Sequence, residues 1–170
     1  MKIGLAIPTY NAGEDFKDVL AAINSNSDLL SKKIIIDSES NDGTRLLAKN
    51  AGFTAYNIKR SEFTHGLVRN KIANTLSDCD YIIYMTQDVY IKKNAIKNIY
   101  DYITEYPDMA IAYGKQIVDI SKSDVFEQRD RIFNYPDKSI VKRYSDKDRL
   151  GIKTVFSSDA FAIYKTEYLM

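Results

Sequence analysis

Short apolar runs alternate along this chain with longer segments in which apolar residues recur at every third or fourth position. The first run covers residues 2–7 and ends at Pro8, which predicts a buried strand. The segment behind it carries an apolar stripe at Phe16, Val19, Leu20 and Ile23. That spacing is typical of an amphipathic helix. The chain is therefore expected to begin with a strand followed by a helix.

The same pattern repeats toward the C-terminus. Apolar runs predict further strands at residues 34–36, 54–58, 81–85, 109–118 and 154–164. Apolar stripes predict helices over residues 67–76 and 96–106, and another that opens at Asp42, whose carboxylate can cap exposed amides. The polar and aromatic stretch 126–149 fits neither pattern, and we interpret it as a candidate functional loop. Alternating elements predict an α/β fold with a mixed, mostly parallel sheet and helices on both faces.

Composition narrows the class of protein. The 170 residues are 45% apolar and 28% charged, which is typical of one folded domain. A net charge of +1, with both signs interspersed, argues against binding to nucleic acid. The single cysteine, Cys79, excludes an internal disulfide and suits a reducing compartment. No segment is long enough for a membrane span, so we expect a soluble, cytoplasmic chain.

Polar residues follow three of the predicted strands. They occupy positions 8–11, 37–42 and 87–88. Ligands of open α/β sheets bind beyond the carboxyl ends of the strands, so these segments are the candidate site. The chain contains neither G-x-G-x-x-G nor G-x-x-x-x-G-K-[ST], which argues against dinucleotide dehydrogenases and P-loop enzymes. It also lacks the glycine-rich basic loop expected of a nucleotidyltransferase after the first strand.

Two of these segments carry a family resemblance. Ile7-Pro-Thr-Tyr-Asn11 and Asp37-Ser-Glu-Ser-Asn-Asp-Gly-Thr44, in this order and spacing, resemble the opening of family 2 glycosyltransferases. Five further segments resemble the rhamnosyltransferase-like branch of that family: residues 63–70, 86–88, 113–116, 131–136 and 156–160. The resemblance implies a GT-A fold, a Rossmann-like fold that binds nucleotide-diphospho-sugars. Residues 1–170 are then expected to form one such domain.

The resemblance also implies a donor site. The residues it places there are Pro8, Thr9, Tyr10, Asp37, His65, Arg69, Gln87 and Asp88. Asp37 is expected to bind the base or ribose, and Arg69 the phosphates. Asp88 keeps one carboxylate of the family's D-x-D motif, which implies a divalent cation, Mg²⁺ or Mn²⁺, held mainly by diphosphate and water.

Structural roles remain open for the same residues. Asp37 and Asp88 can serve as turn and helix-cap residues, and Arg69 can form a surface ion pair. His65, expected in a loop beside Gly66, either contacts the donor or supports that loop through a hydrogen bond. Gly66 is expected there because of the backbone conformation that the loop requires. Asp159, expected inside a strand, either lines the acceptor side or is structural.

The implied reaction transfers a sugar to a polysaccharide or lipid-linked glycan with inversion at the anomeric carbon. By branch, the donor is dTDP-rhamnose and the product a bacterial cell-surface polysaccharide such as an O antigen. A UDP-hexose donor is the alternative. The family's catalytic base lies in a downstream acidic motif that is not reached before Met170. A C-terminally truncated and inactive fragment is therefore expected.

Two further classes of function stay open. One is a non-catalytic nucleotide-binding module. The other is a structural domain in which Asp37, Asp42 and Asp88 only stabilise turns, although the ordered series of motifs argues against it. For the full-length protein, a lipid-linked acceptor implies peripheral association with the cytoplasmic face of the inner membrane.

Overall fold

The computed structural model describes residues 1–118 and 124–170, which form two compact units. The first, called the sheet unit below, consists of residues 1–113 and 159–170. The second, called the helical unit, consists of residues 114–158. Each unit is described by itself.

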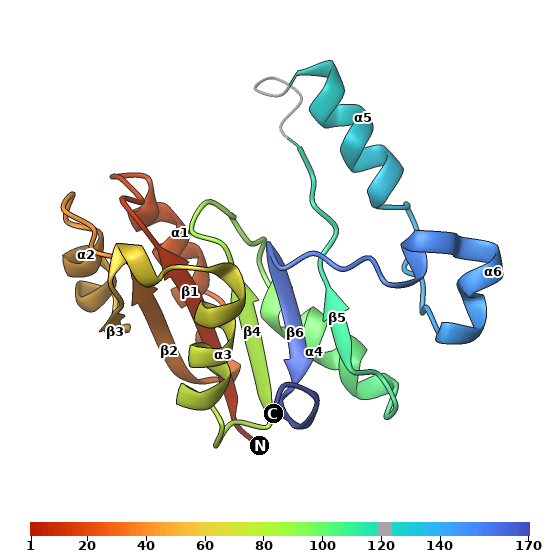
Figure 1. The fold of residues 1–170 in the computed structure, drawn as a ribbon, viewed down its shortest axis with the longest axis horizontal. Coiled ribbons are helices and arrows are strands. Elements are labelled where there is room, and N and C mark those ends of the chain that lie inside the picture. The colour runs from red at the N-terminus through yellow and green to blue at the C-terminus, as the bar shows by residue number, and fades with distance from the viewer. Residues whose placement is uncertain (119–123) are drawn as a thin grey trace. The chain divides into compact units, whose positions relative to one another are not determined.

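The sheet unit contains a six-stranded sheet with the order β3-β2-β1-β4-β6-β5 (Figure 1). Its strands are β1 (Ile3–Thr9), β2 (Leu30–Asp37), β3 (Thr54–Asn57), β4 (Tyr81–Met85), β5 (Ile111–Tyr113) and β6 (Phe161–Lys165). The first four strands run parallel, whereas β6 is antiparallel to both β4 and β5. The predicted mixed, mostly parallel sheet is confirmed.

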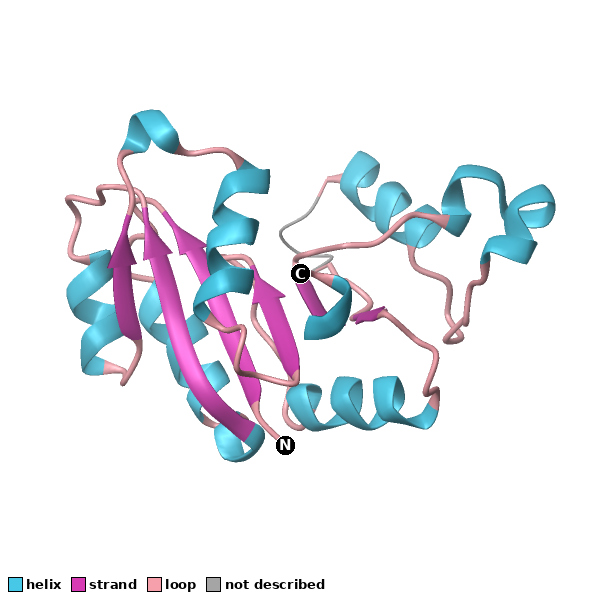
Figure 2. Ribbon diagram, turned by 60° about the horizontal axis from the view of Figure 1, so that its bottom comes forward, coloured by secondary structure: helices cyan, strands magenta, loops and turns pink. Residues whose placement is uncertain are grey.

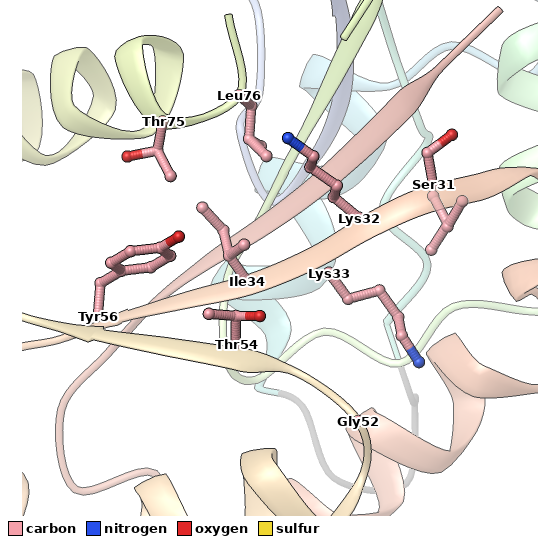
Figure 3. Close-up of a pocket in the computed structure, with 10 residues that line it drawn as sticks. Ser31, Lys32, Lys33, Ile34, Gly52, Thr54, Tyr56, Thr75 and Leu76 are labelled. Atoms are coloured by element: carbon pink, nitrogen blue, oxygen red, sulfur yellow. The ribbon is translucent and has the colours of Figure 1, made fainter. Parts of the chain in front are cut away.

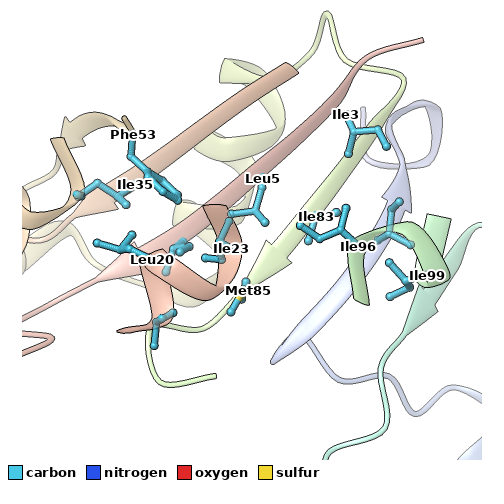
Figure 4. Packing of buried hydrophobic residues seen from close by; sticks show 14 of the residues in the cluster. Ile3, Leu5, Leu20, Ile23, Ile35, Phe53, Ile83, Met85, Ile96 and Ile99 are labelled. Carbon is cyan, nitrogen blue, oxygen red and sulfur yellow. The ribbon is translucent and has the colours of Figure 1, made fainter. Parts of the chain in front are cut away.

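Helices cover both faces of this sheet (Figure 2). They are α1 (Phe16–Asn24), α2 (Thr44–Asn50), α3 (His65–Thr75) and α4 (Ala95–Glu105). Successive side chains of a strand point to opposite faces, so Ile83 packs with α1, α2 and α4, whereas Ile82 packs with α3. Figure 4 shows the first of these two cores, in which Leu20 and Ile96 meet the strands. The helix faces that the apolar stripes predicted to be buried are thus packed against the sheet.

The strand register determines which residues reach the carboxyl edge. β1 stays paired with β2 as far as Thr9 and Asp37, but its pairing with β4 ends at Ala6. Pro8 therefore lies in a strand end with one neighbour, where a missing amide hydrogen is tolerated. The strand continues to Thr9 instead of ending before Pro8 as predicted.

Two predicted strands are much shorter than expected. The run 109–118 gives only β5, whose three residues pair with β6 alone. The run 154–164 begins in the 3-10 turn Gly151–Thr154, and regular pairing with β4 starts only at Phe161. Hydrophobic runs without a continuous partner strand thus stay irregular, and Asp159 lies before β6 rather than inside it.

The helical unit contains α5 (Val125–Asn134) and α6 (Lys147–Leu150). In the described part of the chain, the remaining short 3-10 helices are Ser27–Leu29, Arg60–Glu62, Tyr144–Asp146 and Thr166–Tyr168. Lys142 Nζ donates to the carbonyls of Lys153 at 2.9 Å and Phe156 at 2.5 Å, which ties together segments that carry little regular structure. The stretch 126–149 therefore contains helices where we expected a loop. None of the helices described is long and apolar enough to cross a membrane.

Gly4 of β1 packs tightly against residues that directly follow α3. A Cβ atom there would lie 2.8 Å from Leu76 Cδ1 and 3.2 Å from Cys79 Sγ. We expect Gly4→Val to lower the free energy of unfolding by about 1–3 kcal/mol, because it overpacks a buried face. Urea denaturation measures this loss. Gly66→Ala, at a helical position with open space, is the control and should be neutral or stabilising. Equal losses at both positions would contradict the packing argument.

Candidate functional site

Asp37 joins the ends of β1 and β2. Its Oδ1 accepts hydrogen bonds from Thr9 Oγ1 at 2.9 Å and Ser40 Oγ at 2.6 Å, and its Oδ2 accepts one from Ser40 N at 2.9 Å. The residue is 0% exposed. A buried carboxylate is tolerated when its oxygens are hydrogen-bonded in this way. Asp37 therefore lies beneath the surface that Thr9 and its neighbours present.

Asp42 makes a second connection between the same two loops. Its Oδ2 accepts from Gly13 N at 2.8 Å, and its Oδ1 accepts from the amide and hydroxyl of Thr44. Burial alone would raise the pKa of Asp42, but the hydrogen bonds from Thr44 and Gly13 together lower it. Asp42 thus accepts from the first amide of α2 and from the loop after β1, whereas Gly43 occupies the N-cap position of the helix.

Gln87 fixes the third strand end. Its Oε1 accepts from the amide of Tyr10 at 2.9 Å, and its Nε2 donates to the carbonyl of Tyr10 at 3.2 Å. The loop after β4 is thereby joined to the loop after β1. The three polar segments that the sequence singled out converge on one edge of the sheet.

A cavity of about 230 Å³ lies at this edge. Its lining residues are Pro8, Thr9, Tyr10, Phe63, His65, Val68, Arg69, Tyr84, Met85, Thr86, Gln87 and Asp159. Six of the predicted donor-site residues thus meet around one cavity, together with Asp159. Asp37 and Asp88 are not part of the lining.

Sequence reasoning missed a contact beside the cavity. The Arg60 guanidinium lies 3.8 Å from the centre of the Tyr10 ring, a cation–π geometry. The amide of Arg60 donates to Glu39 Oε2 at 2.8 Å, and Glu39 has a left-handed φ of 62°. Non-glycine residues in that region are uncommon and concentrate near functional sites. No local sequence pattern predicts that Glu39 and Arg60 would meet.

Arg69 and Asp159 form an ion pair within the cavity. Arg69 Nη2 lies 2.5 Å from Asp159 Oδ2, and the two side chains are 37% and 24% exposed. Tyr84 donates its hydroxyl to the carbonyl of Arg69 at 3.0 Å. Burial raises the pKa of Tyr84 to about 12, so this phenol stays protonated near neutral pH. The sequence placed Tyr84 in a strand, and a buried phenol in need of a partner is the signal that could have drawn attention to it.

His65 and Gly66 lie in the first turn of α3 and not in the predicted loop. The helix starts earlier than its apolar stripe because Thr64 Oγ1 caps it by accepting from Leu67 N at 3.1 Å. Gly66 has an ordinary φ and open space around it, so the expected backbone role is wrong. The His65 ring packs edge-on to Phe63, with ring centres 5.3 Å apart.

Asp88 is exposed and follows Gln87 directly. Its carboxylate accepts no hydrogen bond from the described residues. Among the same residues, no group of three or more His, Cys, Asp or Glu could hold a metal ion. One free carboxylate next to a cavity fits a cation that takes its other ligands from a diphosphate and water. It does not fit a cage built from protein ligands alone.

A second cavity, of about 320 Å³, lies at the other end of β2 (Figure 3). Lys32 and Lys33 extend from opposite faces of the strand there. Lys32 Nζ donates to Asp78 at 2.7 Å, and Lys33 Nζ donates to Asn24 Oδ1 at 2.6 Å. Both ammonium groups at this cavity thus already have hydrogen-bond acceptors.

The mostly parallel sheet, with a cavity at its carboxyl edge, has the α/β arrangement of the GT-A class of solved structures that it resembles. Residues 5–170 match the family described as "Glycosyl transferase family 2", and the chain belongs to this family. It is 43% identical over 168 residues to the O-antigen chain rhamnosyltransferase RfbN of Salmonella typhimurium and 34% identical over 163 residues to the O-antigen chain rhamnosyltransferase WbaN of Salmonella anatum. These matches cover 97% and 95% of the chain.

The chain spans about half the length of these curated relatives, 52% of RfbN and 51% of WbaN. Among solved structures, glucosyl-3-phosphoglycerate synthase from Mycobacterium tuberculosis matches with a TM-score of 0.67 at 15% identity. That match covers 98% of this chain and 57% of the synthase. The synthase structure contains Mn²⁺, uridine diphosphate and glucosyl-3-phosphoglycerate. At this identity the likeness supports the fold.

The two aspartates at this edge should differ in their effect on stability. Asp37→Ala removes the acceptor of the buried Thr9 hydroxyl, and we expect it to lower the free energy of unfolding by about 1–3 kcal/mol. Asp88→Ala removes an exposed carboxylate and should change that free energy by less than about 0.5 kcal/mol. Urea denaturation of both variants measures the difference, and similar values would contradict the structural role of Asp37.

Proposed function

We propose that this chain is the donor-binding part of an inverting glycosyltransferase that transfers rhamnose from dTDP-rhamnose to a polysaccharide or lipid-linked glycan. The observation that carries the proposal is the 43% identity to RfbN over nearly the whole chain. The convergence of the predicted residues on one cavity supports it independently. A bacterial O antigen is the product that the relatives favour.

In this proposal the cavity holds the nucleoside diphosphate of the donor. Thr9 and Tyr10 flank the nucleoside, with Asp37 holding the Thr9 hydroxyl in place. Arg69 and His65 approach from α3 and face the diphosphate, where a guanidinium forms charge-assisted hydrogen bonds. Asp88 binds Mg²⁺ or Mn²⁺, which supplies charge neutralisation to the departing diphosphate. The contacts of Gln87 with Tyr10 join the loop that flanks the nucleoside to the loop that carries Asp88, beside the diphosphate.

The reaction requires an acceptor hydroxyl to attack the anomeric carbon while a base removes its proton. Asp159 is the one carboxylate among the described lining residues of the cavity. Its two oxygens are engaged by Arg69 and Tyr164, so we assign it no role as that base. The contribution of this chain to the rate is then the positioning and electrostatic stabilisation of the leaving group.

A UDP-hexose donor is the second candidate. The structurally similar synthase binds uridine diphosphate with Mn²⁺, and thymine and uracil differ by a single methyl group. For either donor, we propose that the whole protein works in the cytoplasm at the face of the inner membrane, where a lipid-linked acceptor is presented.

Calorimetric titration with dTDP and UDP, with and without Mn²⁺, tests donor binding. We expect saturable binding that Mn²⁺ strengthens, and a loss of about tenfold in affinity in Asp88→Ala when Mn²⁺ is present. The preferred nucleotide decides between the two donors. Asp101→Ala, on the exposed surface of α4, is the matched control and should bind like the wild type. A folded wild-type chain that binds neither nucleotide would refute the proposal, and binding without transfer by the full-length protein would favour a non-catalytic module.

A further inference from the structure

A network of side chains connects α3 to the start of β6. Asp159 Oδ2 lies 2.5 Å from Arg69 Nη2, and Asp159 Oδ1 accepts a hydrogen bond from the Tyr164 hydroxyl at 2.5 Å. Both carboxylate oxygens are therefore engaged, one by the guanidinium and one by the phenol. The residues come from α3, from the segment before β6 and from β6 itself.

The sheet fixes the members of this network. The amide of Thr86 donates to the carbonyl of Ala160 at 3.2 Å, which holds Asp159 beside the end of β4. Tyr164 pairs with Ile82 in the antiparallel register of β6 and β4. The Tyr84 and Tyr164 rings meet edge to face, with centres 5.4 Å apart. The carboxylate thus has a defined position before any ligand arrives.

An arginine side chain has many rotamers, and holding it in one of them costs conformational entropy. A partly exposed ion pair contributes little to stability, so the pair between Arg69 and Asp159 matters mainly for where the guanidinium lies. Asp159 contacts Nη2 of Arg69, a side chain that lines the cavity, and a guanidinium has further N–H donors beyond those that this contact uses. Orientation in advance lowers the cost of binding an anion.

We propose that Asp159, itself held by Tyr164, is a positioning residue that presents the Arg69 guanidinium to the diphosphate of the donor. This inference rests on the proposed function, and it moves Asp159 from the acceptor side of the site to the support of its phosphate contact. The proposal also explains why a carboxylate lies in a cavity that binds an anion, because the ion pair with Arg69 neutralises the charge of Asp159.

Asp159→Asn in the 170-residue chain tests the proposal, because Asn keeps the shape and can still accept from Tyr164. UDP is titrated in Mn²⁺ by calorimetry, and uridine by NMR shifts. We expect UDP binding to weaken about tenfold and uridine binding to stay within about twofold, since only the diphosphate meets Arg69. Tyr164→Phe should also weaken UDP binding, and it replaces Asp159→Asn as the test variant if Asp159→Asn does not fold. Asp101→Asn, which breaks an exposed ion pair on α4, is the matched control.

A double-mutant cycle with Arg69→Gln separates positioning from a general structural effect. In the Arg69→Gln background, Asp159→Asn should cause no further loss of UDP affinity. Two results would overturn the positioning role while leaving donor binding intact. The first is that Asp159→Asn weakens UDP and uridine binding equally. The second is that Asp159→Asn leaves UDP affinity unchanged although Arg69→Gln lowers it. Tighter UDP binding by Asp159→Asn would also overturn it, because Asp159 would then compete with the diphosphate. A wild-type chain that binds neither dTDP nor UDP refutes the proposed function itself.

Discussion

The buried carboxylate of Asp37 is the interaction on which the site depends. It accepts hydrogen bonds from Thr9 at the end of β1 and from Ser40 in the loop after β2, with no exposure to solvent. A buried carboxyl group without hydrogen-bond partners is costly, so the contacts with Thr9 and Ser40 allow Asp37 to be buried at this position. The parallel register, which brings Thr9 and Asp37 opposite each other, makes this arrangement possible.

The other loops at the carboxyl edge are linked to the ends of β1 and β2. The loop after β1 is held by Asp42 and Thr44 on one side and by Gln87 on the other. Tyr10 is thereby fixed between the loops after β2 and β4, with the Arg60 guanidinium over its ring. The cavity opens between this rigid edge and α3, which carries His65 and Arg69. The site is therefore built from elements whose positions the sheet sets, and Asp88 is left exposed beside it.

The sequence predicted β1, β2 and β4 and the helices α1, α3 and α4 because each buries apolar side chains, as Ile83 and Leu20 do. It also predicted β3, whose residues stay mostly exposed. It also predicted that the residues after β1, β2 and β4 would meet, since parallel strands end at one edge. It failed for residues 109–118 and 154–164, where apolar runs have no continuous partner strand. The pairing of Arg69 with Asp159 joins residues 90 positions apart, and no local pattern encodes such a contact.

The central claim is that the carboxyl edge of the sheet binds a nucleoside diphosphate together with a divalent cation. Paramagnetic broadening by Mn²⁺ in the presence of UDP, followed on the amide signals of the isotope-labelled chain, tests it most directly because the effect falls steeply with distance from the ion. The account predicts that broadening centres on the amides of Tyr10, Gln87 and Asp88 and that it disappears in Asp88→Ala. Broadening centred on Lys32 and Asp78, at the opposite end of β2, would contradict it.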